Sequence, residues 1–111
     1  MGEFLVSTVE SVPGYEVKEI LGTVTGNTVR AKHLGKDILA GLKKLVGGEL
    51  EEYTDMLNDA REESMNRMVK SAKELGADAV IGARFMTSAV SQGAAELLAF
   101  GTAVKLKKKA R

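Results

Sequence analysis

Residues 79–106 read AVIGARFMTSAVSQGAAELLAFGTAVKL, and this stretch decides the fold. Apolar and β-prone residues run on both sides of a turn at Ser91-Gln92-Gly93, so we expect two strands, 78–88 and 94–106. Side chains alternate between the two faces of a strand, and here both faces are largely apolar. One face of the second strand, called the small-residue face below, consists of Ala95, Leu97, Ala99, Gly101 and Ala103.

The small-residue face predicts self-association. One layer of helices covers one face of a sheet, and we expect the helices on the opposite face, with Phe100 and Val104. An antiparallel sheet that faces water carries polar residues on its outer side, which the small-residue face lacks. We therefore predict that another subunit covers it, with Gly101 permitting close backbone approach. The alternative is that this face curls over the N-terminal strands of the same chain.

The N-terminal third predicts short strands. Residues 4–9 form a β-prone run that ends before Pro13-Gly14, and residues 15–25 alternate in the pattern of a strand. Gly26-Asn27 fits a tight hairpin turn because both residue types tolerate positive φ, and residues 28–31 would be the return strand.

After Gly35 the spacing of apolar residues changes to the period of a helix. Apolar residues between 38 and 46 recur at three and four residues and predict a first helix, which Gly47-Gly48 ends. A longer helix begins near Glu49 and ends before Gly76, a preferred left-handed cap. Its inward stripe is Leu50, Tyr53, Leu57, Ala60, Ser64, Met68, Ala72 and Leu75. The chain is therefore predicted to be one α+β domain over residues 1–111, with residues 105–111 as a frayed basic tail.

Composition narrows the function classes. The chain has 111 residues, 44% of them apolar, no cysteine and a net charge of +1. The charge balance indicates no nucleic acid or membrane partner, and aromatic residues do not interleave with the basic tail. The N-terminus has no basic region followed by a signal-type apolar run, and no stretch approaches a span of about 20 apolar residues. We therefore expect a cytoplasmic protein.

Metal-ligating residues are few. Soft metals prefer thiolate, thioether or imidazole ligands, and the chain offers no thiolate and one histidine, His33. Met56, Met65, Met68 and Met86 could supply thioethers, but methionine at helical spacing is more often core filler. The best carboxylate candidates recur at helical spacing and share one helix face: Glu52, Asp55, Asp59, Glu62 and Glu63. Such a charge run is usually a solvated face, and a hard divalent cation is the alternative occupant. No cofactor is predicted.

Catalytic motifs are missing from the sequence. Gly35-Lys36 is similar to the end of a phosphate loop, but Arg30 stands where the first glycine belongs and Asp37 replaces Ser or Thr. We find no set of nucleophile, base and oxyanion donors. Three hypotheses remain: a non-enzymatic homo-oligomer with a ligand or partner at subunit interfaces, a metal-binding module, and an enzyme whose site assembles across subunits.

Four segments, in order along the chain, carry a family resemblance: VPGYE at 12–16 with LG at 21–22, LGKDILAGL at 34–42 through VGGEL at 46–50, LGADAVIG at 75–82 and GTAV at 101–104. In these segments the chain resembles the YbjQ family, also called UPF0145 or DUF74, a domain suggested to bind heavy metals. The resemblance implies a two-layer β-α-β-β core with an antiparallel sheet, similar to a dodecin subunit. It also implies a ring-like homo-oligomer, a pentamer.

The ligand inventory predicts that the protein does not bind soft metals tightly. One imidazole without thiolates does not make a zinc or copper site. Titration with Zn²⁺ or Cu²⁺ should therefore give no sub-micromolar dissociation constant. A sub-micromolar affinity that disappears in His33→Ala would contradict this prediction.

Overall fold

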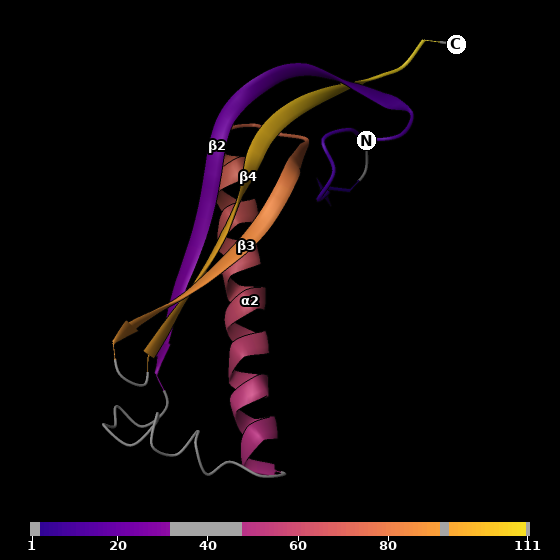
Figure 1. Cartoon of the computed structure of the whole chain (residues 1–111). Helices are drawn as coiled ribbons and strands as arrows, with labels where there is room; N and C mark the ends of the chain where they lie inside the picture. Colours follow the sequence, from indigo (N-terminus) through magenta and orange to yellow (C-terminus); the bar gives the residue numbers. More distant parts are fainter. Residues whose placement is uncertain (1–2, 32–47, 92–93, 111) are drawn as a thin grey trace.

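The computed structural model describes residues 3–31, 48–91 and 94–110. Along the chain the described elements are β1 (Leu5–Val6), β2 (Tyr15–Ala31), α2 (Gly48–Glu74), β3 (Ala79–Ser91) and β4 (Ala94–Lys108) (Figure 1). The predicted first helix, 38–46, and its Gly47 boundary lie outside the described residues. The α+β class and the order β-α-β-β are confirmed.

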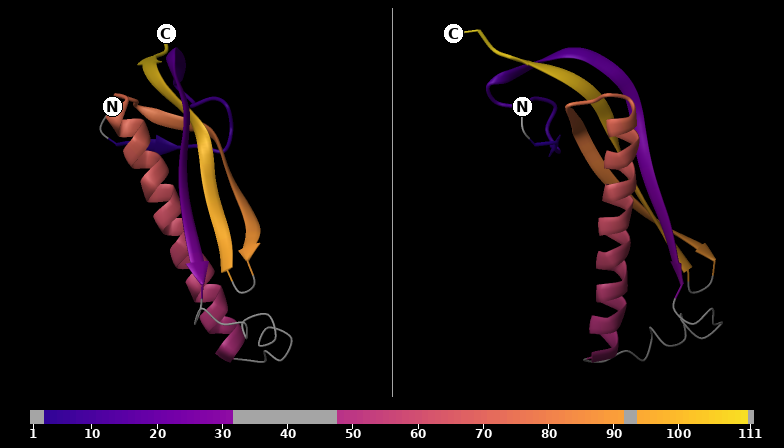
Figure 2. Two further views of the ribbon diagram at one scale, coloured as in Figure 1. Left: turned by 90° about the vertical axis from the view of Figure 1, so that its left-hand side faces the viewer. Right: turned by 180° about the vertical axis from the view of Figure 1, so that it is seen from behind.

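The strands form one sheet in the order β1-β3-β4-β2. β4 lies in the middle and is antiparallel to both β2 and β3. The sheet is mixed rather than wholly antiparallel, because β1 pairs in parallel with β3 through Leu5–Ala79 and Val6–Val80. Helix α2 lies across one face of the sheet, which gives the two layers seen in Figure 2.

The predicted hairpin at Gly26-Asn27 is wrong. β2 runs without a break through these residues and pairs with β4 from Tyr15–Lys108 to Ala31–Ala94. Gly26 is needed for a different reason. A Cβ at this position would run into the Ser64 carbonyl oxygen and the Met68 amide nitrogen of α2. Gly26 therefore marks the place where the helix backbone lies directly on the strand backbone.

The core lies between α2 and the sheet. Met68 and Ala72 of the helix pack against a layer of small and branched residues of the sheet: Val24, Val80, Ala83, Ala99 and Ala103. The Ser64 hydroxyl is fully buried and bridges the layers, with its oxygen 3.0 Å from both Thr28 Oγ1 and the Leu97 carbonyl oxygen. The predicted stripe is confirmed at Ala60, Ser64, Met68 and Ala72. Leu75 is 49% exposed and lies beyond it.

The helix ends as the sequence predicts. Gly76 adopts a φ of 83°, the left-handed region that favours glycine. The Gly76 amide donates to the Lys73 carbonyl at 2.9 Å, and the Ala77 amide donates to the Ala72 carbonyl at 3.1 Å. This pair of hydrogen bonds is the Schellman motif, which satisfies the last carbonyls of the helix.

The helix covers the small-residue face, so the prediction that it lies on the opposite face is wrong. Leu97, Ala99 and Ala103 are at most 1% exposed within the single chain. Short side chains let the helix approach the sheet closely, whereas the larger Leu98 and Phe100 would hold it away. The sequence pattern defined the two faces of β4 but not which one the helix takes.

A bulge in β3 changes which residues point toward the helix. Gly82 has a φ of 63°, and the register with β4 shifts between Ile81 and Arg84. As a result Val80 and Ala83 both join the core under α2. On the other face a second cluster joins Val12 to sheet residues: Ala79, Ile81, Val104 and Leu106. The regular alternation of side chains between the two faces of β3 therefore breaks at Gly82.

The predicted frayed tail, 105–111, is wrong as far as Lys108, because residues 105–108 belong to β4. β4 continues to that residue, and Leu106 to Lys108 pair with Val17 to Tyr15 of β2. The Leu106 amide also donates to the Asp78 carboxylate at 2.9 Å. The long partner strand β2 supplies the pairing that the sequence pattern did not indicate.

Replacing Gly26 with alanine should destabilise the protein strongly, by about 3 kcal/mol, because the added methyl group meets helix backbone that cannot rotate away. The midpoint of chemical denaturation measures the loss. The matched control is Thr25→Ala on the exposed face of the same strand, which should cost less than about 1 kcal/mol. Equal losses for the two variants would contradict the close contact.

Candidate functional site

The helix leaves uncovered the side of the sheet opposite α2. Cross-strand partners share a face of the sheet. Two rows of three partners therefore cross this side: Thr25–Phe100–Arg84 and Asn27–Leu98–Met86. We call these six residues, with Val29 and Glu96, the open sheet face. The cluster around Val12 covers only the end of this side near Val104.

The open sheet face has an apolar centre and a polar frame. Met86 is 59% exposed and Val29 is 53% exposed, and Phe100 and Leu98 between them are half-buried. The Asn27 amide donates to the Glu96 carboxylate at 3.4 Å. An apolar centre with a hydrogen-bonded polar rim is typical of surfaces that associate with protein.

Arg84 fastens the N-terminal segment to the edge of β3. Its Nη1 donates to the Thr8 carbonyl at 2.6 Å and to the Ala83 carbonyl at 3.0 Å. Backbone bonds continue the attachment beyond β1, from the Ala83 amide to the Ser7 carbonyl at 2.9 Å and from the Gly82 amide to the Val9 carbonyl at 3.0 Å. Sequence reasoning missed this role, because nothing in the pattern of the strand shows that a remote segment returns to it.

The predicted interface residues come together, but beneath the helix. Gly101 is buried, and a Cβ there would lie 2.5 Å from the Val80 side chain. Ala95, at the edge of the set, is half-buried. Contact between subunits through these residues would require α2 to move, so the open sheet face is the better candidate.

The predicted acidic stripe does not assemble a metal site in the described part of the chain. Asp55, Asp59 and Glu62 are exposed on α2, and Glu63 is half-buried in an ion pair with Arg67. His33 and the Glu52 side chain lie outside what the structure describes. Among the described residues no three histidine, cysteine, aspartate or glutamate side chains gather where they could hold an ion.

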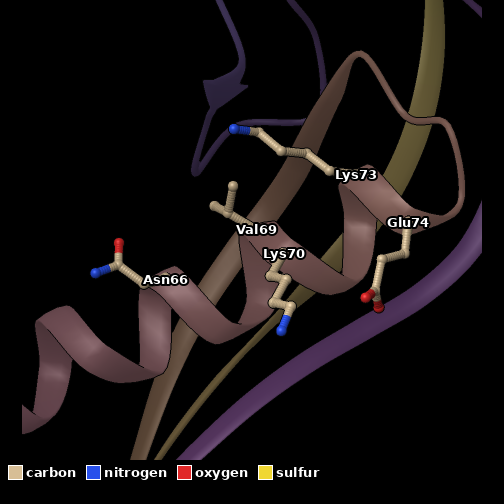
Figure 3. A pocket seen from close by; sticks show the side chains of 5 residues that line it. All are labelled: Asn66, Val69, Lys70, Lys73 and Glu74. Carbon is tan, nitrogen blue, oxygen red and sulfur yellow. The ribbon is translucent and has the colours of Figure 1, made fainter.

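A shallow hollow lies on the exposed surface of α2 near its C-terminal end (Figure 3). Its lining residues are Asn66, Val69, Lys70, Lys73 and Glu74. Figure 3 shows Lys73 directed toward the N-terminal segment and Lys70 directed away from it. The Lys73 ammonium lies 5.5 Å from the centroid of the Phe4 ring, a cation–π contact. The two lysines thus do not converge on one point.

Arg84→Met should release the N-terminal segment without unfolding the sheet, because it removes two charge-assisted hydrogen bonds at the surface and keeps the length of the side chain. We expect a stability loss of about 1 kcal/mol and faster cleavage by a glutamate-specific protease at Glu10. The control is Lys70→Met on the helix surface, which should change neither quantity. An unchanged cleavage rate in Arg84→Met would show that the backbone bonds of Ser7 and Val9 suffice.

Comparison with known families gives a match over most of the chain. Residues 4–107 match the YbjQ family, whose description is "putative heavy-metal-binding". The sequence is similar to the UPF0145 protein of Archaeoglobus fulgidus, 68% identical over 105 residues, which are 95% of this chain and 97% of the relative. It is also similar to a UPF0145 protein of Thermus thermophilus, 62% identical over 94% of this chain and 91% of the relative.

The fold has a counterpart among solved structures. A DUF74-family protein of unknown function from Pediococcus pentosaceus superposes with a TM-score of 0.63 over 92% of this chain and 96% of its own. The two sequences are 17% identical, so the likeness concerns the fold alone. In the described parts of our chain, no helix combines the length and the apolar character needed to cross a membrane.

Proposed function

This chain belongs to the YbjQ family, and we propose that it is a non-enzymatic homo-oligomer that binds a small ligand or a partner molecule where its subunits meet. The proposal rests on the shape of the subunit. Its Cα radius of gyration is 17.6 Å, whereas a compact domain of this length has about 13 Å. The principal extents are 58 × 24 × 19 Å.

The accessible surface supports the same proposal. It amounts to 7386 Å², whereas a folded monomer of this mass exposes about 5,900 Å². The excess is about 1,500 Å². A subunit in a ring has two neighbours, and a standard interface removes about 800 Å² from each partner. The excess surface is therefore close to what two such contacts would bury.

Burial of exposed apolar side chains would favour association of subunits through this surface. Met86 and Val29 are exposed on the open sheet face, and Phe85, which is 43% exposed, lies on the helix side of β3, where it pairs with Ala99. Each such side chain contributes about 1.5–3 kcal/mol when it is fully buried. The subunit number that we favour, five in a ring, comes from the family resemblance.

Ligand binding at the subunit contacts is the second half of the proposal. The hollow on α2 is open to solvent and is walled by one helix only. Pockets that hold small molecules are concave and enclose most of the ligand. The open sheet face lies on the other side of the sheet, where neighbouring subunits would enclose a site to which Asn27, Glu96 and Arg84 offer polar groups.

A metal-binding module is the second candidate, because the family description names heavy metals. Asp55, Asp59 and Glu62 are exposed along one helix, so a neighbouring subunit would have to complete any coordination sphere. An enzyme assembled across subunits is the third candidate, and the described residues bring together no set of catalytic groups that supports it.

The oligomer proposal predicts that the purified protein sediments as a single species larger than the subunit at micromolar concentration. Native mass spectrometry of the same sample gives the subunit number and any retained ion or organic ligand. Met86→Asp should weaken association at least tenfold, because it places a charge on a surface that association would bury. Lys70→Glu, on the outer helix surface, should assemble normally. A monomeric parent protein would refute the proposal.

A further inference from the structure

Within the part of the chain that the structure describes, two strand edges of the sheet are open. β2 is the last strand on one side, and no described strand lies beyond it. On the other side, β1 and residues 7–9 cover β3 only as far as Ala83. An exposed edge carries unpaired amide and carbonyl groups that readily pair with another strand.

The edge of β2 is protected along its first half only. The first half carries charged residues at 16, 18 and 19, and its register with β4 shifts at two places before Thr23. Charges and bulges are the usual devices that prevent strands from joining at an edge. The second half, TVTGNTV at 23–29, has no charge, no proline and a continuous register.

The uncovered edge of β3 has the same character. After Arg84, residues 85–89 read FMTSA, with no charge and no proline, and their register with β4 is continuous. All five side chains are exposed.

The two unprotected edges lie on opposite sides of β4 at the same position along it. Thr25 and Arg84 both pair with Phe100, and Val29 and Ser88 both pair with Glu96. β2 and β3 also run in the same direction, since each is antiparallel to β4. Rotation about an axis along the strands would therefore bring the β2 edge of one copy beside the β3 edge of the next, in parallel.

We propose that copies of this chain join by parallel pairing of the second half of β2 (residues 23–29) with the free edge of β3 (residues 85–89) of the next copy. Unlike edges meet in this contact, so the pairing repeats from copy to copy and can close into a ring. The inference rests on the proposed oligomer and adds which surfaces form the contact. It places α2 on the outside of the continuous sheet and the open sheet face on the inside.

Arg67 contacts one of the groups on the β2 edge that would take part. Its Nη1 donates to the Asn27 carbonyl at 2.5 Å, and its Nη2 is held by Glu63. The Ala83 amide points outward to Ser7, so Met86, three residues on, directs its backbone groups inward to Leu98. Leu98 therefore faces β3, and its partner on β2, Asn27, directs its backbone groups away from β4. Residues two apart in an antiparallel strand point the same way, so Thr25 and Val29 also direct theirs outward. A carbonyl oxygen has two lone pairs, so Asn27 can accept an amide of a neighbouring strand while it keeps its bond to Arg67.

Amide hydrogen exchange on the assembled protein tests the contact residue by residue. The backbone amides of Thr25 and Val29 should exchange about as slowly as those of Val24 and Thr28, which point toward β4 and serve as internal controls. If the protein sediments as an oligomer while Thr25 and Val29 exchange like solvent-exposed amides, the edge proposal fails and the oligomer proposal stands. If the protein is a monomer, both fail.

Cysteine cross-linking then tests the pairing of unlike edges. The natural chain has no cysteine, so introduced thiols have no competitors. Thr25→Cys places a thiol on the open-face side of β2, and Met86→Cys or Ser88→Cys places one on the same side of β3. On oxidation, at least one of the two double variants should give a ladder of covalent multimers on a denaturing gel, and the single variants should stay monomeric. Covalent dimers of the Thr25→Cys single variant would show that like edges meet and would overturn the proposal.

Discussion

The contact between α2 and β2 at Gly26 is the constraint on which the rest of the structure depends. A Cβ here would occupy the space of the Ser64 carbonyl and the Met68 amide, so the helix and the strand touch backbone to backbone. Beside this point Ser64 and Thr28 share a buried hydrogen bond of 3.0 Å, which sets how far along the strand the helix lies. The short side chains of Ala99 and Ala103 on neighbouring β4 then complete the floor under the helix.

This close layer also explains why so much of the subunit remains uncovered. One helix lies mainly over β2 and β4. Among the described residues, the opposite side of the sheet is covered only where Val12 and Tyr15 pack near Val104. The strands are long, with 17 residues in β2 and 15 in β4, so they extend beyond what one helix and a short N-terminal segment can shield. The described part of the chain thus has a well-packed interior but leaves much of one sheet face exposed.

Periodicity predicted the elements that depend on local sequence. The long helix, its buried stripe and its cap at Gly76 were predicted because helical spacing and glycine conformation are local properties. The hairpin at Gly26 and the side of the sheet taken by the helix were predicted wrongly, because both depend on contacts between residues almost 40 positions apart, such as Gly26 with Ser64. The role of Arg84 was missed for the same reason, since its partner Thr8 is 76 positions away. Of the candidate site, the sequence indicated an unusual apolar sheet but not which side of it stays open.

At the Gly82 bulge, the numbering of the β3 residues that face the helix changes from even to odd. Before it, even-numbered residues such as Val80 face the helix; after it, odd-numbered residues such as Ala83 do. Insertions and deletions in this strand are therefore not equivalent to those in a loop. Loss of a single residue between Ile81 and Arg84 would turn the whole second half of the strand over, exchanging Phe85 and Met86 between the two sides of the sheet. The number of residues in this strand therefore determines which side chains face the helix as much as their identity does.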